Sequence, residues 1–191
     1  WGKWERKNLV YLLPGVVVVV GMPASGKSTV GQALAKRLGV PYADTDALIE
    51  ARTGKLIREI FTDDGEAVFR RIEEEVVAEA LGGDGVLSLG GGAILSPRTR
   101  ALLRGHEVVW LDVSVATATR RAGMNQLRPL LLGDVRARMQ TLLEARLPLY
   151  REVATLRIDT NRRSASKVAT RIVAYLHGQD PDTVAEGEEG R

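Results

Sequence analysis

The stretch Gly21-Met-Pro-Ala-Ser-Gly-Lys-Ser28 constrains the fold of this chain more than any other feature of its sequence. It matches the pattern G-x-x-x-x-G-K-[ST], follows the β-branched run Val16 to Val20 and opens a helical pattern that extends from Lys27 to Leu38. This is the context in which the pattern forms a phosphate-binding loop, or P-loop. A glycine-rich turn with a surface lysine would leave strand, pattern and helix coinciding by chance. The sequence therefore predicts a P-loop.

The predicted loop offers several groups to the phosphates of a nucleotide. Its backbone N–H groups, reinforced by the N-terminus of the following helix, can hold phosphate oxygens. Lys27 would reach the β- and γ-phosphates of ATP, and the Ser28 hydroxyl would ligate Mg²⁺. The residues expected to contact the nucleotide here are Gly21, Ala24, Ser25, Gly26, Lys27, Ser28 and Thr29.

Strand and helix patterns alternate along the rest of the chain. Further strands are expected to end at Asp44 and to cover Val86 to Leu89, Val108 to Asp112 and Leu156 to Asp159. Helices are expected at Asp46 to Thr53, Leu56 to Phe61, Gly65 to Ala80, Pro97 to Arg104, Val115 to Arg121, Val135 to Tyr150 and Ser164 to Leu176. Such alternation predicts an α/β fold, with a five-stranded, mostly parallel sheet and helices on both faces. Ligands of this fold bind at the carboxyl ends of the strands.

The 191 residues fit one domain of ordinary size. We expect it to cover residues 15–177, after an N-terminal extension of unclear role at 1–14 and before a disordered acidic tail at 178–191. The charged start and the apolar run Leu9 to Val20 superficially match a secretory signal. However, cleavage after that run would cut into the P-loop, and the run is too short to span a membrane, so we interpret it as a buried strand.

Composition and charge exclude other classes of protein. With 45% hydrophobic and 27% charged residues, the chain has the composition of a globular protein. Its net charge of +3 is spread along the sequence, without the basic stripe or stacking aromatics of a nucleic-acid-binding module. The sequence has no cysteine, which excludes disulfides, thiolate metal sites and cysteine nucleophiles and allows a reducing compartment. We expect a cytoplasmic monomer that binds neither nucleic acid nor membranes.

Two aspartates, Asp44 and Asp46, follow the second predicted strand. Residues two apart on an extended chain project to the same side, so both carboxylates can point into the crevice above the sheet. One could hold the magnesium shell, and the other could accept the proton of an attacking hydroxyl. The alternative is that Asp46 merely caps the next helix, because aspartate is a favoured N-cap.

Three further motifs could contact a ligand. Gly90 to Gly92 directly follow a predicted strand, and their backbone permits close approach by a ligand, although a plain loop would read the same way. Glu73 lies three residues after Arg70 on a predicted helix and could orient its guanidinium, although a surface ion pair is the commoner outcome. Arg128 begins Arg-Pro-Leu-Leu between two helices and could be carried by a mobile lid over the phosphates.

From about Val16 to Leu176 the chain resembles the shikimate kinase family of P-loop small-molecule kinases, which have a nucleoside-monophosphate-kinase-like fold. The motifs that carry the resemblance, in the family's order and near its spacing, are the P-loop, Asp44-Thr-Asp46, Gly65-Glu-x-x-Phe-Arg-Arg-x-Glu73, Gly90-Gly-Gly92, Arg128-Pro-Leu-Leu and Arg146-x-Pro-Leu-Tyr150. The resemblance implies Mg²⁺-dependent transfer of the ATP γ-phosphoryl group to the 3-hydroxyl of shikimate. The products would be ADP and shikimate 3-phosphate, in a step of chorismate and aromatic amino-acid biosynthesis.

The resemblance also implies roles for individual residues. The residues implied to bind shikimate are Asp46, Arg70, Gly90, Gly91, Gly92 and Arg146, with the two arginines on its carboxylate. Asp44 would bind Mg²⁺ through water, together with Ser28. The implied catalytic residues are Lys27, Asp46 as the base, and Arg128. A planar guanidinium can hold a carboxylate by two hydrogen bonds, which agrees with the implied acceptor.

On the nucleotide side the resemblance implies roles for Arg121, Arg128 and Arg163. Arg120 adjoins Arg121 and Arg162 adjoins Arg163, so the sequence leaves open which member of each pair meets the nucleotide. Ala24 stands where the family's loops often carry glycine, and this restricts the loop without removing a required group.

Two other functions stay open on the sequence. A related P-loop kinase, for gluconate or a nucleoside monophosphate, would share the loop and the sheet, because the fold alone does not select the acceptor. A catalytically silent homologue could use the same fold to bind a nucleotide or a partner. The set Asp46, Arg70, Gly91 and Arg146 argues against the first alternative, and the intact catalytic residues argue against the second.

Overall fold

The valine run that precedes the P-loop forms the central strand of the molecule. In the computed structural model, which describes residues 15–123 and 132–184, this strand is β1 (Val16–Gly21), and all of its residues are buried. The even-numbered valines belong to one core cluster and the odd-numbered valines to another. Side chains alternate between the faces of a strand, so a strand covered on both faces needs apolar residues at every position.

The sheet has five strands in the order β2-β3-β1-β4-β5. The other strands are β2 (Tyr42–Asp44), β3 (Gly85–Ser88), β4 (Glu107–Asp112) and β5 (Leu156–Asp159). Every neighbouring pair is parallel, so the expectation of a mostly parallel sheet is met by one that is parallel throughout. As a result, all five carboxyl ends lie along one edge of the sheet.

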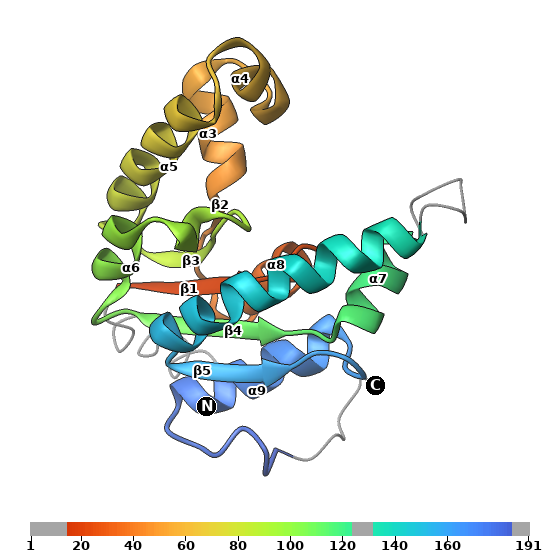
Figure 1. The fold of residues 1–191 in the computed structure, drawn as a ribbon. Helices are drawn as coiled ribbons and strands as arrows, with labels where there is room; N and C mark the ends of the chain where they lie inside the picture. The colour runs from red at the N-terminus through yellow and green to blue at the C-terminus, as the bar shows by residue number, and fades with distance from the viewer. Residues whose placement is uncertain (1–14, 124–131, 185–191) are drawn as a thin grey trace.

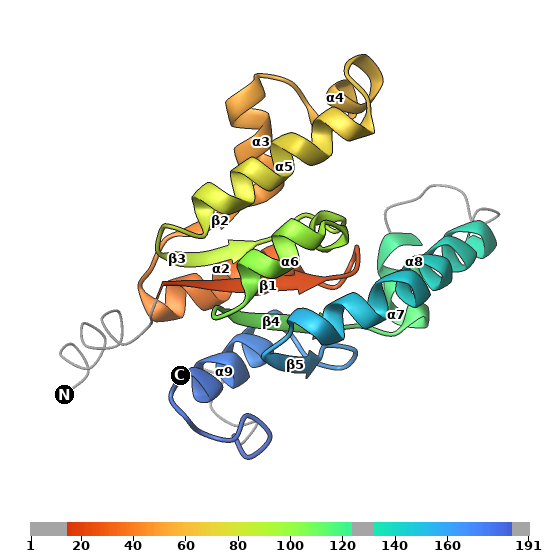
Figure 2. The same cartoon turned by 60° about the vertical axis from the view of Figure 1, so that its left-hand side comes forward.

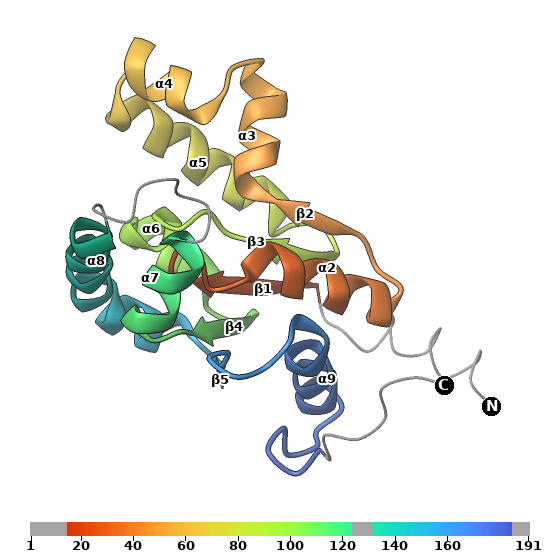
Figure 3. The ribbon, with the colours of Figure 1, turned by 90° about the vertical axis from the view of Figure 1, so that its right-hand side faces the viewer.

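Helices cover both faces of the sheet, as the sequence predicted. Figure 3 shows α2 (Lys27–Leu38) and α9 (Ala165–Leu176) on one face, with α6 (Pro97–Leu103) and α8 (Leu132–Val153) on the other. Leu34 and Ile172 belong to the core between the sheet and the first pair of helices, and Leu103 and Tyr150 belong to the core on the opposite face. The helix α7 (Val115–Gly123) follows β4 and packs beside α8.

Three consecutive helices stand beyond the β2 and β3 side of the sheet (Figures 1 and 2). They are α3 (Thr45–Thr53), α4 (Ile57–Asp63) and α5 (Glu66–Ala80). They have a small core of their own, formed by Ile49, Ile60, Phe69 and Val76. An ion pair between Arg52 and Glu79 also joins α3 to α5.

The structure differs from the predicted elements in two places. A short 3₁₀ helix, η1 (Ala93–Leu95), follows the three glycines where no element was expected. The helix α8 extends beyond the predicted Val135 to Tyr150 at both ends; Pro148 lies inside it, as the prediction implied.

The structure describes only part of the expected tail, and it does not describe the expected N-terminal extension or the residues around Arg128. Arg171 of α9 donates a hydrogen bond of 2.8 Å to the Pro181 carbonyl, so the first residues of the expected tail lie against this helix. The expected extension at 1–14, the expected lid with Arg128, and residues 185–191 lie outside the described residues. Among the helices that the structure describes, none is both long and apolar enough to cross a membrane.

Candidate active site

The P-loop turns tightly between β1 and α2, as predicted. A methyl group on Gly21 would come 2.6 Å from Ser25 Oγ and 2.9 Å from the Leu111 carbonyl oxygen. Gly26 caps α2 with φ of 90°, and Ala24 has φ of 63°. Only glycine adopts such values without strain, so Ala24 carries a local cost that a glycine would avoid.

Lys27 lies within this turn and points back to its carbonyls. Its Nζ donates hydrogen bonds to the oxygens of Gly21 at 2.7 Å and Met22 at 3.3 Å. Burial lowers the pKa of Lys27 from 10.5 to about 8; nearby Asp46 opposes this shift, and Arg146 adds to it. Ser28 and Thr29 are exposed in the first turn of α2, where N–H groups without helical partners can meet an anion.

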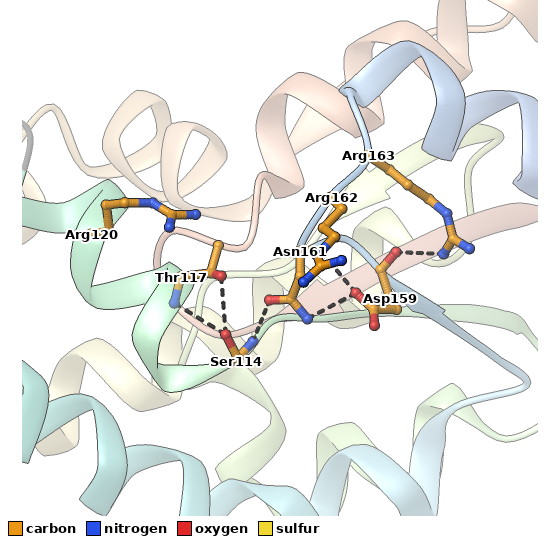
Figure 4. Close-up of a pocket in the computed structure, with 7 residues that line it drawn as sticks. All are labelled: Ser114, Thr117, Arg120, Asp159, Asn161, Arg162 and Arg163. Atoms are coloured by element: carbon orange, nitrogen blue, oxygen red, sulfur yellow. Dashed lines mark hydrogen bonds between the residues drawn. The ribbon is translucent and has the colours of Figure 1, made fainter. Parts of the chain in front are cut away.

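Beside the P-loop a cavity of about 640 Å³ opens at the carboxyl ends of β4 and β5 (Figure 4). Its wall is a connected set of short polar contacts. Asn161 donates to Asp159 Oδ1 at 2.8 Å through both its backbone and side-chain nitrogens and accepts from the Ser114 N–H at 2.8 Å. Ser114 and Thr117 share a hydrogen bond of 3.0 Å. These contacts hold the loops after β4 and β5 together.

Three of the four arginines in the two pairs that the sequence left open line this cavity. Arg120, Arg162 and Arg163 line it, and Arg163 donates to the Asp159 carbonyl at 2.8 Å. Arg121 instead bridges the P-loop to the loop after β5, because it donates to the carbonyls of Ala24 at 3.2 Å and Thr160 at 2.9 Å. Arg121 is therefore the member of its pair that contacts the P-loop.

Asp44 ends β2 and Asp46 lies in the first turn of α3, and the structure assigns the cap of α3 to a different aspartate from the one considered in the sequence. Asp44, not Asp46, caps α3, because its Oδ1 accepts the N–H groups of Asp46 at 2.8 Å and Ala47 at 3.3 Å. The interpretation of Asp46 as a helix cap is therefore wrong. Between them, the buried Thr45 accepts a hydrogen bond of 2.8 Å from the Gly90 N–H through Oγ1. This contact fixes the start of the glycine triplet against α3.

Each glycine of the triplet faces a different residue that was predicted to bind the acceptor. A methyl group on Gly90 would come 2.6 Å from Asp46 Oδ1, and one on Gly91 would come 3.2 Å from Arg146 Nη1. One on Gly92 would come 2.5 Å from both terminal nitrogens of Arg70. The backbone of the triplet thus lies directly against one carboxylate and two guanidinium groups. The interpretation of the triplet as a plain loop does not account for these contacts.

Asp46 sits in an environment suited to accepting a proton. Burial, followed by the negative charge of Asp44, raises its pKa, while Lys27 and Arg70 oppose the increase. A carboxylate with a raised pKa is a stronger base than one in water. Asp46 lies against Gly90, and it is close enough to Lys27 for the two charges to interact.

Arg70 is held by a buried acid rather than by a surface ion pair. Its Nη1 donates to Glu73 Oε1 at 2.8 Å, and the side chain of Glu73 is only 3% exposed. Burial raises the pKa of Glu73, and the hydrogen bond from Arg70 opposes this shift. The surface alternative is therefore wrong for Glu73. Its role is to fix the guanidinium that faces Gly92.

Arg146 is more deeply buried than Arg70, the other arginine predicted to bind the acceptor. It is 9% exposed, and among the described residues its Nη1 has no hydrogen-bond partner. A buried guanidinium nitrogen of this kind calls for an anion. One turn further along α8, the ring of Tyr150 stacks on that of Trp110, with centroids 5.6 Å apart. This packing anchors the part of α8 that carries Arg146.

The predicted metal residues fit a magnesium ion shared with phosphates. Ser28 is exposed at the start of α2, and both capping bonds of Asp44 use Oδ1 alone. No group of three or more His, Cys, Asp and Glu side chains suited to a metal occurs among the described residues. Mg²⁺ is commonly held by one or two protein groups together with water and substrate phosphates, so a larger cluster is not required.

Some contacts that build the site were not predicted from the sequence. Thr45 was noticed only as the spacer between two aspartates, although its hydroxyl joins α3 to Gly90. Asn161 and Ser114 lie on separate loops and meet only when β4 and β5 pair. Their position just after predicted strands was the one available indication, because ligands bind at such ends.

Comparisons with known proteins identify similar chains and structures. A family model described as shikimate kinase matches residues 23–177. Shikimate kinase of Mycobacterium tuberculosis (strain ATCC 25177 / H37Ra) is 55% identical over 170 residues, which cover 88% of this chain and 97% of the relative. The solved shikimate kinase of Acinetobacter baumannii in complex with shikimate has a TM-score of 0.82 and 34% identity over 94% of this chain and 99% of its own.

A gluconokinase from Sinorhizobium meliloti 1021 is similar at a lower level. Its structure has a TM-score of 0.57 and 22% identity, over 87% of this chain and 93% of its own. This similarity shows a common fold only. By contrast, the M. tuberculosis relative is 55% identical to this chain and the A. baumannii relative is 34% identical. The fold, the site and these similarities together lead to one assignment: the chain belongs to the shikimate kinase family.

Proposed function

We propose that this chain transfers the γ-phosphoryl group of ATP to the 3-hydroxyl of shikimate, giving shikimate 3-phosphate and ADP. The observation that carries the proposal is the glycine triplet, whose three members face Asp46, Arg146 and Arg70. One carboxylate and two guanidinium groups around an open backbone suit a small acceptor that has hydroxyls and a carboxylate. The name of the A. baumannii relative, solved with shikimate, supports the same acceptor.

On the donor side, the P-loop backbone and the N-terminus of α2 would hold the phosphates of ATP. Lys27 would exchange its bonds to Gly21 and Met22 for phosphate oxygens, and its charge would favour the transition state. The cavity beside Arg120 and Asn161 would take the nucleoside. We propose Mg²⁺ as the accompanying ion, held by Ser28 and, through water, by Asp44; it would neutralise phosphate charge when bound.

On the acceptor side, the two arginines would bind the carboxylate of shikimate. Glu73 would keep Arg70 in place, and burial would strengthen the bond that Arg146 makes to an anion. Asp46 would then accept the proton of the attacking hydroxyl, which its raised pKa favours. The site would thus orient the acceptor between the base and the phosphates.

A monomer is the proposed state of assembly, because it is the simplest one for a single domain of ordinary size. A cytoplasmic place of action is proposed on the ATP requirement and on a sequence without cysteine, which suits a reducing compartment. Size-exclusion chromatography with light scattering would test the first of these proposals. A dimer at micromolar concentration would contradict it.

The test of the proposed function is a comparison of acceptors. ADP release would be measured with Mg-ATP alone and, separately, with shikimate, gluconate or AMP. Shikimate should stimulate ADP release strongly, and the other two should leave it near the level of ATP alone. Equal stimulation by gluconate or AMP would contradict the proposal, and no stimulation by any of them would favour a silent homologue.

A further inference from the structure

The segment that follows the glycine triplet is bonded to it and then to a single arginine. The Leu95 N–H donates to the Gly92 carbonyl at 3.1 Å as part of η1. At the end of η1, Arg100 Nη1 donates to the carbonyls of Ile94 at 2.7 Å and Leu95 at 3.0 Å. Helix ends leave carbonyls without partners inside the helix, so Arg100 supplies the donors that η1 lacks.

The same guanidinium also holds α8. Arg100 Nε pairs with Glu152 Oε2 at 2.7 Å, and the Arg100 side chain is only 17% exposed. Pairs between fully exposed charges contribute little, but a planar guanidinium that is mostly buried and bonded on two sides fixes the elements between which it lies. Glu152 is on α8, the helix that carries Arg146. Arg100 therefore connects the backbone after the triplet to the helix of one acceptor arginine.

The segment is tied to the other arginine's helix as well. Ser96 Oγ donates to Glu74 Oε1 at 2.7 Å. Glu74 is the neighbour of Glu73, which holds Arg70 on α5. Both η1 and α6 contact α5 on one side and α8 on the other, and Figure 2 shows them between these two helices. Residues 93–100 thus form a connection between the two helices that carry the acceptor arginines.

We propose that Arg100 is a positioning residue for the acceptor site. It fixes α8, and with it Arg146, relative to the glycine triplet and α5, so that two guanidinium groups meet one carboxylate at the correct separation. This inference rests on the proposed function for its choice of acceptor. Small misplacements of binding groups have large kinetic costs. Loosening this connection should therefore raise the KM for shikimate before it changes the KM for ATP.

The kinetic test compares Arg100→Met with Arg104→Met. Arg104 is an exposed arginine at the end of the same helix and serves as the matched control. Arg100→Met should raise the KM for shikimate on the order of tenfold while kcat and the KM for ATP stay within about twofold. Arg104→Met should resemble the wild type. Arg100→Lys should be intermediate, because an ammonium keeps the charge but lacks the planar fork of a guanidinium.

A distance measurement separates positioning from a general loss of stability. The chain has no cysteine, so cysteines introduced at Arg71 on α5 and Ala137 on α8, both exposed, can be spin-labelled alone. Arg100→Met should broaden or shift the distance distribution between the labels, and Arg104→Met should not. An Arg100→Met protein with the KM for shikimate and the distance distribution of the Arg104→Met control would overturn the proposal.

The test still decides the proposal if Arg100→Met does not fold or if the wild type does not phosphorylate shikimate. If Arg100→Met does not fold, Glu152→Ala replaces it, because Glu152 is 49% exposed and its loss removes only the bond to α8. It should raise the KM for shikimate and broaden the distribution; wild-type values for both would overturn the proposal. If the wild type does not phosphorylate shikimate, the proposed function fails, and the distance distribution alone decides whether Arg100 sets the separation of the helices.

Discussion

The three glycines that follow β3 differ in what a side chain would meet, which makes them separate probes of the site. Gly92 faces the guanidinium of Arg70, whereas Gly91 faces that of Arg146 at a longer distance. Gly92 also has φ of −98°, a value that alanine adopts without strain. A methyl group there should therefore displace a guanidinium without disturbing the backbone.

For Gly92→Ala we expect a dissociation constant for shikimate that is higher on the order of tenfold, because Arg70 must leave its place beside Glu73. Gly91→Ala, the matched variant, should have a smaller effect, since its methyl group would come 3.2 Å from Arg146 Nη1 rather than 2.5 Å from Arg70. Calorimetric titration of shikimate measures both. Equal affinities for wild type and Gly92→Ala would show that Arg70 does not bind this acceptor.

Lys27 lies in the P-loop, and burial of its charge lowers the stability of the ligand-free fold. Its pKa is near 8 in the folded chain instead of 10.5, so the folded state binds the proton less tightly than the unfolded state. Between these two values the unfolded chain holds more protons, and stability should rise as pH increases through this window. Below pH of about 8 the full cost of a buried charge is present.

Lys27→Met should therefore make the ligand-free protein more stable at pH 7, by about 1 to 2 kcal/mol, and reduce turnover by about 10² to 10³-fold. The increase is smaller than the pKa shift alone implies, because methionine loses the bonds to Gly21 and Met22. Urea unfolding at pH 7 and pH 9.5, with Lys36→Met on the exposed side of α2 as control, measures the stability. A less stable Lys27→Met protein at pH 7 would contradict the burial cost, and near-normal kcat would remove Lys27 from the mechanism.

At the scale of elements, strong local patterns were enough for much of the fold. The valine run of β1 and the helix Lys27–Leu38 were predicted because β-branched repetition and a glycine at each end mark them in the sequence. The 3₁₀ helix at Ala93–Leu95 was missed, because three residues are too few to show a period. The prediction of α8 already ran past Pro148, but the residues that the helix gains at each end were missed, because the ends of a helix have weaker sequence signals than its middle.

The start of α3 gives a prediction that separates capping from metal binding. Asp44→Asn keeps a side-chain oxygen for the N–H groups of Asp46 and Ala47, so the stability of the fold should be unchanged while the Mg²⁺ requirement rises. Asp44→Ala should also lose about 1 kcal/mol of stability with the cap. Asp46→Asn should instead keep Mg-ATP binding and lose phosphoryl transfer, because an amide cannot accept the proton.

Metal titration of kcat, together with urea unfolding, distinguishes the three variants. Indistinguishable Mg²⁺ dependence of Asp44→Asn and Asp46→Asn would show that the two aspartates do not have separate roles. Equal stability of Asp44→Ala and the wild type would show that the cap does not contribute to the fold.

At the scale of the whole molecule, the α/β class and the position of the site followed from alternation of strands and helices. The strand order β2-β3-β1-β4-β5 did not, because alternation does not say which strands become neighbours. The same limit applies to contacts between distant segments. The spacing of Arg70 and Glu73 predicted their pairing but not the burial of Glu73, and Thr45 meets Gly90 only because β2 pairs with β3.

Division of labour across the molecule can be tested with Arg128, whose expected place on the lid lies outside the described residues. A cation that arrives when a lid closes should act mainly on the transition state, so Arg128→Ala should lower kcat by up to about 10³-fold and leave the dissociation constant of shikimate within about threefold. Arg146→Met should chiefly weaken shikimate binding, because it removes a buried partner of the carboxylate. Loss of shikimate affinity in Arg128→Ala with unchanged kcat would place Arg128 in the acceptor site instead.

The proposed phosphoryl transfer can be tested by following the phosphoryl group itself. Phosphorus and proton NMR of a reaction that contains the purified chain, Mg-ATP and shikimate would identify the products and the hydroxyl that is modified. We expect ADP and shikimate phosphorylated at its 3-hydroxyl in equal amounts, with almost no inorganic phosphate. ADP accompanied by inorganic phosphate and unchanged shikimate, or a phosphate on a different hydroxyl, would contradict the proposed transfer.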